Sequence, residues 1–193
     1  MWFPVIFCPP FGEMTFSVKF KDILADLPAL CGRAAADPAG RVAIPMAPVL
    51  LCHQGNCVTT HARGFAEALF RQVPGANVYR AYHESGRPRI PGTIDVTECL
   101  LPDLPGRRLH VATLFAQNRP GGNDFGEPRL LWFRQCLDQI ELLCQGGQYR
   151  GLAFPWSVGC GLAGGDWRDY EKALLDFAVA NPSLTVTLYY NGN

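Results

Sequence analysis

The sequence predicts a single α/β domain of three layers, in which helices cover both faces of a mixed, mostly parallel sheet. Short continuous apolar runs at residues 48–52, 109–115 and 151–156 are typical of strands that helices cover on both sides. Amphipathic helical patterns lie between these runs. Because strands and helices alternate along the chain, most strands are expected to run parallel.

Composition agrees with one compact domain and limits the choice of partners. The chain has 193 residues, of which 48% are hydrophobic and 18% charged, so a buried core is possible and intrinsic disorder is excluded. Seventeen basic residues balance seventeen acidic ones. Without a strong net field, we expect neither a nucleic acid nor a membrane as the partner.

The N-terminal residues predict an extension followed by an edge strand. Residues 14–20 alternate, with Phe16, Val18 and Phe20 on one side, which is the period of a half-buried strand. Residues 1–13 form the expected extension. They have no basic leader and are interrupted by prolines, so neither a signal peptide nor a membrane span is expected. We therefore expect an intracellular, cytoplasmic protein, with the nucleus open as an alternative.

Three amphipathic helices and a closing strand account for most of the remaining chain. The region of residues 30–42, which is rich in Ala, Gly and Pro, is expected to be an insertion in loop or short helical form. Residues 184–190 alternate as a final strand. Apolar side chains recur at helical spacing in three groups: Phe65, Ala66, Leu69, Phe70 and Val73; Leu130, Phe133, Leu137, Ile140 and Cys144; and Trp167, Tyr170, Leu174 and Phe177.

The eight cysteines are expected to be reduced and mostly buried, because no CxxC pair occurs and several lie in apolar segments. Cys52, His53, Cys57 and His61 lie close enough in sequence for a zinc site to be considered. Their spacing matches none of the usual pairings, and neighbours on a strand point to opposite faces. We predict no metal and no cofactor.

Two polar loops are candidates for the functional site. Residues 50–70 pass from a strand through polar residues to Gly64, where a helix begins. Residues 154–167 carry Gly159, Gly161, Gly164 and Gly165 between a strand and a helix. Glycines let backbone amides approach an anion, and helix N-termini favour phosphate. A diphosphate between the two loops is therefore plausible, although steric reasons alone can also place glycines in such turns.

The segments HQGNCVTTHARGFAEALF and FPWSVGCGLAGGDW resemble the macrodomain family. The similarity is to the branch that contains ADP-ribose 1''-phosphate phosphatases and terminal ADP-ribose hydrolases. Further support comes from KDIL at Asp22, VATLFAQ at residues 111–117, Gly92 after a polar turn, and the final TVTLYY. The resemblance spans about residues 15–190 and implies a macrodomain-like domain over residues 14–193.

The resemblance implies a cleft for ADP-ribose or a derivative of it. Asp22 is expected near the adenine amino group, with Ile23 beside it, and Asn56 near the distal ribose. One phosphate is expected on the first loop and the other on the second. The residues implied for these two phosphates are Ala62, Arg63, Gly64 and Phe65, and Gly159, Cys160, Gly161, Leu162, Ala163 and Gly164.

Three residues are candidates for catalysis. His53 has an ordinary pKa close to neutrality and suits an acid or base; the alternative is a histidine bonded to neighbouring backbone. Asn56 is the candidate positioning group. Asp166 is a candidate for orienting water, although an Asp directly before a helix most often caps it. Arg63, Arg107, Arg108 and Arg119 are candidates to border the cleft, against the commoner case of scattered surface arginines.

The resemblance allows two functions. One branch of similar hydrolases uses a lysine nucleophile, but this chain has lysines only at positions 19, 21 and 172. That chemistry is therefore excluded here, and the phosphatase-like branch matches better. The leading hypothesis is hydrolysis of ADP-ribose 1''-phosphate or a related ADP-ribosyl linkage. The alternative is a non-catalytic module that binds ADP-ribose or ADP-ribosylated protein.

Overall fold

The fold is built on one six-stranded sheet. The computed structural model describes residues 15–31, 47–123, 126–190 and 192. The strands lie in the order β1-β6-β5-β2-β4-β3. Only β3 and β4 pair antiparallel, so the predicted mixed, mostly parallel sheet is confirmed. The strands are β1 (Phe16–Phe20), β2 (Val49–Asn56), β3 (Ile94–Leu101), β4 (Leu104–Gln117), β5 (Gly151–Pro155) and β6 (Thr185–Tyr190).

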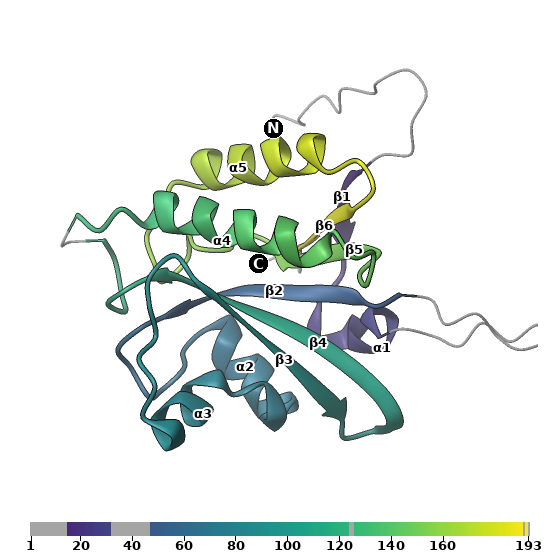
Figure 1. Cartoon of the computed structure of the whole chain (residues 1–193), viewed down its shortest axis with the longest axis horizontal. Coiled ribbons are helices and arrows are strands. Elements are labelled where there is room, and N and C mark those ends of the chain that lie inside the picture. Colours follow the sequence, from purple (N-terminus) through teal and green to yellow (C-terminus); the bar gives the residue numbers. More distant parts are fainter. Residues whose placement is uncertain (1–14, 32–46, 124–125, 191, 193) are drawn as a thin grey trace, which may run out of the picture.

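Helices cover both faces of the sheet, which confirms the three-layer architecture (Figure 1). One face carries α4 (Arg129–Cys144) and α5 (Trp167–Ala180). The other carries the shorter helices α1 (Leu27–Leu30), α2 (Phe65–Gln72) and α3 (Val78–Ser85), with the 3-10 turns η1 (Leu24–Asp26) and η2 (Pro74–Ala76). No helix in these described ranges is long and apolar enough to cross a membrane.

The central strand β2 contributes to two hydrophobic cores. Leu50 and Cys52 face the core under α4 and α5, whereas Leu51 faces the core under α1, α2 and α3. All three are 0% exposed. They contribute to different cores because successive side chains of a strand point to opposite faces. Each fully buried leucine contributes about 1.5–3 kcal/mol, so both cores fix the position of β2.

Several elements differ from the sequence prediction. The strand predicted at residues 48–52 continues through polar residues to Asn56, and α3 and β3 were not predicted. The prediction of β1 as an edge strand is confirmed, but Phe20 is 82% exposed rather than half-buried. The predicted N-terminal extension lies outside the described residues, as does the 30–42 insertion apart from buried Leu30 and Cys31.

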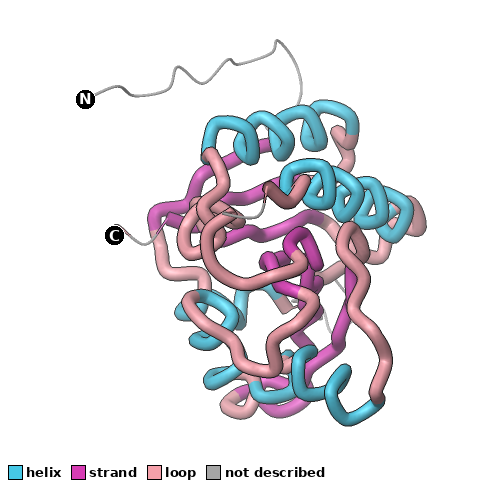
Figure 2. Tube along the Cα trace, turned by 90° about the vertical axis from the view of Figure 1, so that its left-hand side faces the viewer, coloured by secondary structure: helices cyan, strands magenta, loops and turns pink. Residues whose placement is uncertain are grey.

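The carboxyl ends of β1, β2, β4, β5 and β6 lie at one edge of the sheet, because these five strands are parallel. The loops that follow them gather at this edge between the two helix layers (Figure 2). Ligands of open α/β sheets bind beyond the carboxyl ends of the strands. This edge is therefore where the predicted site residues have to be compared with the structure.

Candidate functional site

The first loop, residues 57–64, is shaped by Asn56 at the end of β2. Asn56 is 6% exposed, and its Oδ1 accepts hydrogen bonds from the N–H groups of Val58 and Thr59 at 3.1 and 2.8 Å. Its own N–H and Nδ2 donate to the hydroxyl of Tyr79 on α3 at 3.0 and 3.2 Å. The side chain predicted to position a ribose therefore points inward and fixes the path of the loop.

The first loop ends at the N-terminus of α2. Gly64 occupies the N-cap position with φ 60° and ψ −133°, a conformation that favours glycine, and no side chain of the described residues caps this helix. The first-turn N–H groups of an uncapped helix carry partial positive charge and suit an anion. Arg63 is exposed directly beside them, while Ala62 and Phe65 are partly buried.

The second loop, residues 156–166, presents several unpaired main-chain N–H groups. Gly159 and Gly164 have positive φ angles of 77° and 67°, and Ser157 (φ 56°) is the one non-glycine residue with a positive φ in the described ranges. Bonds such as the one from Gly165 N–H to the carbonyl of Gly159, at 3.0 Å, close the loop on itself. Six N–H groups of this loop remain without a partner among the described residues, and four of them are consecutive or nearly so: those of Gly159, Gly161, Leu162 and Ala163, beside those of Ser157 and Asp166.

The two loops meet in space. A Cβ atom added at Gly64 would lie 3.2 Å from Cδ1 of Leu162, so the start of α2 touches the second loop. Leu162 is nevertheless 65% exposed, and a Cβ added at Gly161 would meet nothing within 4 Å. The unpaired N–H groups of the second loop and the uncapped N-terminus of α2 therefore lie beside the same solvent-accessible region.

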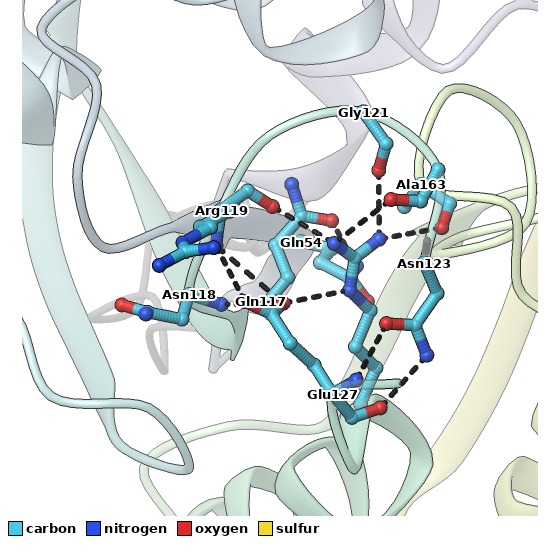
Figure 3. Close-up of polar contacts among 10 residues, drawn as sticks. Gln54, Gln117, Asn118, Arg119, Gly121, Asn123, Glu127 and Ala163 are labelled. Atoms are coloured by element: carbon cyan, nitrogen blue, oxygen red, sulfur yellow. Dashed lines mark hydrogen bonds and ion pairs between the residues drawn. The ribbon is translucent and has the colours of Figure 1, made fainter. Parts of the chain in front are cut away.

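A buried arginine joins the second loop to a third loop, residues 118–123, which follows β4. Arg129, the first residue of α4, is 3% exposed, and its guanidinium donates to carbonyls of both loops (Figure 3). The acceptors are the carbonyls of Gly121 and Ala163, each at 2.7 Å, Arg119 at 2.9 Å and Gly122 at 3.3 Å. A planar guanidinium has five donors, so one side chain can hold four carbonyls in place.

Glu127 completes this arrangement. Its carboxylate lies 3.0 Å from Nε of Arg129 and accepts the main-chain N–H groups of Asn118 and Arg119 at 3.2 and 3.1 Å. Asn123 in turn bonds the backbone of Glu127. Sequence reasoning missed both charged residues, because a Glu-Pro-Arg segment before a helix looks the same whether its charges are solvated or buried.

His53 lies in the interior against α2 rather than at the surface. It is 1% exposed, with its ring 5.6 Å from that of Phe70 on α2. Nε2 is 3.0 Å from the hydroxyl of Thr113, and Nδ1 is 3.3 Å from the carbonyl of Gln54. Burial lowers the pKa of His53 to about 4, against a smaller raising effect of the Gln54 carbonyl. The structure matches the backbone-bonded alternative, and a catalytic role for His53 stays a prediction.

Asp166 lies on the other side of the sheet from His53. It is the N-cap of α5, accepting the N–H of Arg168 at 2.9 Å, as the capping alternative predicted. It also lines a cavity of about 240 Å³ between the starts of α4 and α5. These helices cover one face of the sheet, whereas the Phe70 that packs on His53 belongs to the opposite layer. The structure therefore does not bring the two predicted catalytic side chains together.

A second histidine, His61, lies at the surface of the first loop. His61 lies in the first loop, is exposed, and has its Nδ1 3.1 Å from the hydroxyl of Thr60. It immediately precedes the Ala62–Gly64 segment expected to hold a phosphate. From the sequence, His61 was a candidate only as a metal ligand. In the described residues, no group of three or more His, Cys, Asp or Glu side chains could hold a metal ion.

The end of β1 forms the far part of the same edge. Asp22 is exposed and its Oδ1 accepts the N–H of Leu24 at 2.9 Å, while the side chain of Ile23 is 3% exposed in the core. Of the two residues expected near adenine, Asp22 is therefore the exposed one. Nearby, burial raises the pKa of the Asp26 carboxyl, but hydrogen bonds from Lys19, Lys21 and Tyr189 outweigh burial and lower it below its ordinary value.

Two of the predicted border arginines lie far from this site. Arg107 donates to the carbonyl of Pro28, and Arg108 pairs with Glu98. Both belong to the first half of β4, about 30 Å from the carboxyl end of that strand at about 3.3 Å per residue. For these two the structure matches the alternative of scattered surface arginines, because position along a strand cannot be read from charge alone. Arg63 and Arg119 do lie in loops at the carboxyl edge.

Similarity to known proteins is found in the structure and not in the sequence. No protein-family model matches the sequence, and no curated protein matches it significantly. A structure of a protein of unknown function from Bacteroides thetaiotaomicron is 22% identical, with a TM-score of 0.66 over 93% of this chain and 99% of the other. The macrodomain of Mycobacterium tuberculosis DarG is 21% identical, with a TM-score of 0.59 over 74% and 89%.

A third structure is a complex. Thermosipho africanus DarTG, solved with ADP-ribose, is 15% identical, with a TM-score of 0.53 over 74% of this chain and 38% of that one. At these identities the similarity establishes the fold, which this chain shares with macrodomains.

Proposed function

We propose that this protein binds ADP-ribose or a close derivative across the carboxyl edge of its sheet. The observation that carries the proposal is the contact between Gly64 and Leu162, which brings two sets of unpaired main-chain donors together. The structural similarity to DarTG solved with ADP-ribose supports the choice of ligand.

The donors fit a diphosphate better than a single charged group. The uncapped start of α2 contributes a positive dipole end, and the second loop contributes the N–H groups of Gly161, Leu162 and Ala163. Backbone donors that need no rearrangement bind an anion without losing side-chain entropy. The exposed guanidinium of Arg63 adds a positive charge at the same place.

The rest of the ligand would extend along the edge of the sheet. Three strand spacings separate β1 from β2 in the order β1-β6-β5-β2, which corresponds to about 14 Å. Asp22 and the backbone of Ile23 stand at the β1 end, where adenine is expected from the resemblance. The distal ribose is then expected at the β2 end, beside the loop that Asn56 shapes.

We further propose hydrolysis of ADP-ribose 1''-phosphate as the reaction. A proton has to reach the leaving oxygen or be taken from water, and a histidine suits this step near neutral pH. His53 is the residue expected from the sequence, but its imidazole is buried against Phe65 and Phe70 of α2 and would act only after these residues move away. The exposed His61 needs no such movement.

A non-catalytic binding module is the second candidate. The burial of His53, with its pKa lowered to about 4, favours it, because a buried neutral imidazole serves the packing of α2. Asp166, on the opposite side of the sheet, gives no substitute base beside the first loop. In this case the protein would read ADP-ribose or ADP-ribosylated protein without turnover.

One pair of measurements separates these candidates. Calorimetry of the wild type against ADP-ribose tests binding, and a phosphate-release assay with ADP-ribose 1''-phosphate tests the reaction. Binding with release that falls in His53→Ala or His61→Ala supports the hydrolase and identifies its histidine. Binding without release supports the binding module, and no heat with either ligand overturns the proposal.

A further inference from the structure

Two arginines after α3 stack on tyrosines of that helix. The guanidinium carbon of Arg89 lies 4.8 Å from the ring centroid of Tyr79, and that of Arg87 lies 4.8 Å from the ring centroid of Tyr82. Tyr79 and Tyr82 are one helical turn apart, so the two stacked pairs are neighbours. Such stacking orients a guanidinium and leaves its N–H groups free at the ring edge.

Arg89 differs from Arg87 in its surroundings. The Nη1 atom of Arg89 is buried and has no hydrogen-bond partner in the described structure, whereas Arg87 is exposed to solvent. None of the ion pairs among the described residues includes Arg89. Arg89 as a whole is partly exposed, and its guanidinium carries a positive charge that no carboxylate of the described residues neutralises and that is available to an anionic ligand.

Arg89 lies at the β2 end of the candidate site. The Tyr79 ring beneath it carries the hydroxyl that accepts both hydrogen bonds from Asn56. Cys57, the first residue of the first loop, donates its N–H to the carbonyl of Asn118 at 3.0 Å. Burial raises the pKa of Cys57 to about 11, and the positive charge of Arg89 opposes this rise, which agrees with a guanidinium close to the loop.

We propose that Arg89 binds a terminal phosphoryl group on the distal end of the ligand and so sets the preference of the site for phosphorylated ADP-ribose. This proposal rests on the proposed function, because it assumes that ADP-ribose lies along the carboxyl edge. The main-chain donors of the two loops would hold the inner diphosphate. Arg89 would supply a side-chain positive charge at the end where Asn56 shapes the loop.

The chemistry of the stacked guanidinium suits this group. A phosphate monoester near neutral pH carries between one and two negative charges and offers three acceptor oxygens. A guanidinium can donate two parallel N–H groups to such oxygens, and charge-assisted bonds of this kind are about twice as strong as neutral ones. Unphosphorylated ADP-ribose ends in a neutral hydroxyl, which is a weaker hydrogen-bond acceptor for the Arg89 guanidinium than a phosphate.

The test compares two ligands on three proteins. Calorimetry measures ADP-ribose 1''-phosphate and ADP-ribose binding to the wild type, Arg89→Gln and Arg87→Gln. Where the wild type hydrolyses the phosphate, the titrations are done rapidly in the cold, and the phosphate-release KM is compared as well. Glutamine keeps an amide that can pack on the tyrosine and removes the charge. Arg87→Gln is the matched control, since it removes an equivalent stacked but exposed charge.

The expected result is selective. Arg89→Gln should weaken ADP-ribose 1''-phosphate binding by about tenfold or more while ADP-ribose affinity changes by less than about twofold. Arg87→Gln should change neither by more than about twofold. If Arg89→Gln loses affinity equally for both ligands, or if the wild type binds both ligands equally, the role of Arg89 is overturned and the proposed function is not. A wild type that binds neither ligand overturns the proposed function, and this inference with it.

Discussion

Nη1 of Arg129, at the start of α4, donates a 2.7 Å hydrogen bond to the carbonyl of Ala163 in the second loop. The same nitrogen reaches the carbonyl of Gly121 at an equal distance. A glycine-rich loop has many accessible backbone conformations, and fixing each residue costs about 1–2 kcal/mol of conformational entropy. The guanidinium supplies a hydrogen bond that holds the second loop at Ala163 and fixes it relative to the third loop.

Replacing Arg129 should destabilise the whole domain. Arg129→Ala leaves the Glu127 carboxylate buried without its partner, so we expect the free energy of unfolding to fall by about 3–5 kcal/mol in urea denaturation. Arg134→Ala on the same helix is the control. Its pair with Asp176, at 3.6 Å, is solvent-exposed and should contribute less than about 1 kcal/mol. Equal losses in the two variants would contradict a special role for the buried pair.

Gly161→Val should abolish ligand binding without unfolding the protein. A Cβ at position 161 meets no atom within 4 Å, so the fold accommodates it, while the added methyl groups cover the N–H groups expected to meet a phosphate. We expect ADP-ribose affinity to fall by more than about tenfold in calorimetry, or about 1.4 kcal/mol, with an unchanged melting temperature.

Gly146→Val is the matched control for this variant. Gly146 is exposed after α4 and its added Cβ would meet only the flexible side chain of Gln148 at 3.1 Å. We expect it to bind ADP-ribose like the wild type. If Gly161→Val also binds normally, the ligand does not use the main chain of the second loop.

Gly159→Ala should destabilise the protein far more than the same substitution at another glycine with a positive φ. Its Cβ would lie 2.3 Å from the ring of Tyr170 and 2.6 Å from Oε1 of Gln54, at a φ of +77°. Gly86→Ala, with a φ of +66° and no neighbour within 4 Å, isolates the conformational cost of about 1–2 kcal/mol. We expect Gly159→Ala to cost at least about 2 kcal/mol more in chemical denaturation; equal costs would contradict the tight packing at Gly159.

His53 should make stability depend on pH. Its folded pKa of about 4 lies below the unfolded value of 6.5, so the unfolded state binds a proton that the folded state does not in this range. The neutral His53 therefore contributes about 3 kcal/mol to the free energy of unfolding above pH 6.5, and this contribution is lost as pH falls towards 4. The stability difference between wild type and His53→Gln, measured by urea unfolding, should therefore fall between pH 7.5 and pH 4. A difference independent of pH would contradict the buried, neutral imidazole.

Strand and helix patterns predicted most of the fold. The apolar runs and helical repeats located β2, β4, β5, β6 and the helices α2, α4 and α5. By contrast, β3 is an edge strand in which only Cys99 and Leu101 are buried, so it has no strong hydrophobic period. α3 is amphipathic but has only eight residues, most of them polar, so its apolar face is too short to be recognised in the sequence. The polar end of β2 was missed because main-chain pairing with β4, and not hydrophobicity, extends that strand to Asn56.

The site was predictable in its loops and less so in its side chains. Glycine spacing identified both loops, because main-chain access depends on local sequence. The directions of His53, Asn56 and Asp166 depend on which core or helix each one meets, and this is a tertiary property. Arg89 and Arg129 gave no sequence signal, since their roles arise from partners at a distance in the chain, Tyr79 and the Ala163 carbonyl.

Amide chemical shifts of the isotope-labelled protein during an ADP-ribose titration test the central claim most directly. We predict that the largest changes occur at the unpaired N–H groups of Gly159, Gly161, Leu162 and Ala163 and at the first turn of α2. Changes confined to other surfaces, or no change at about 1 mM ligand, would contradict a diphosphate site formed by the two loops.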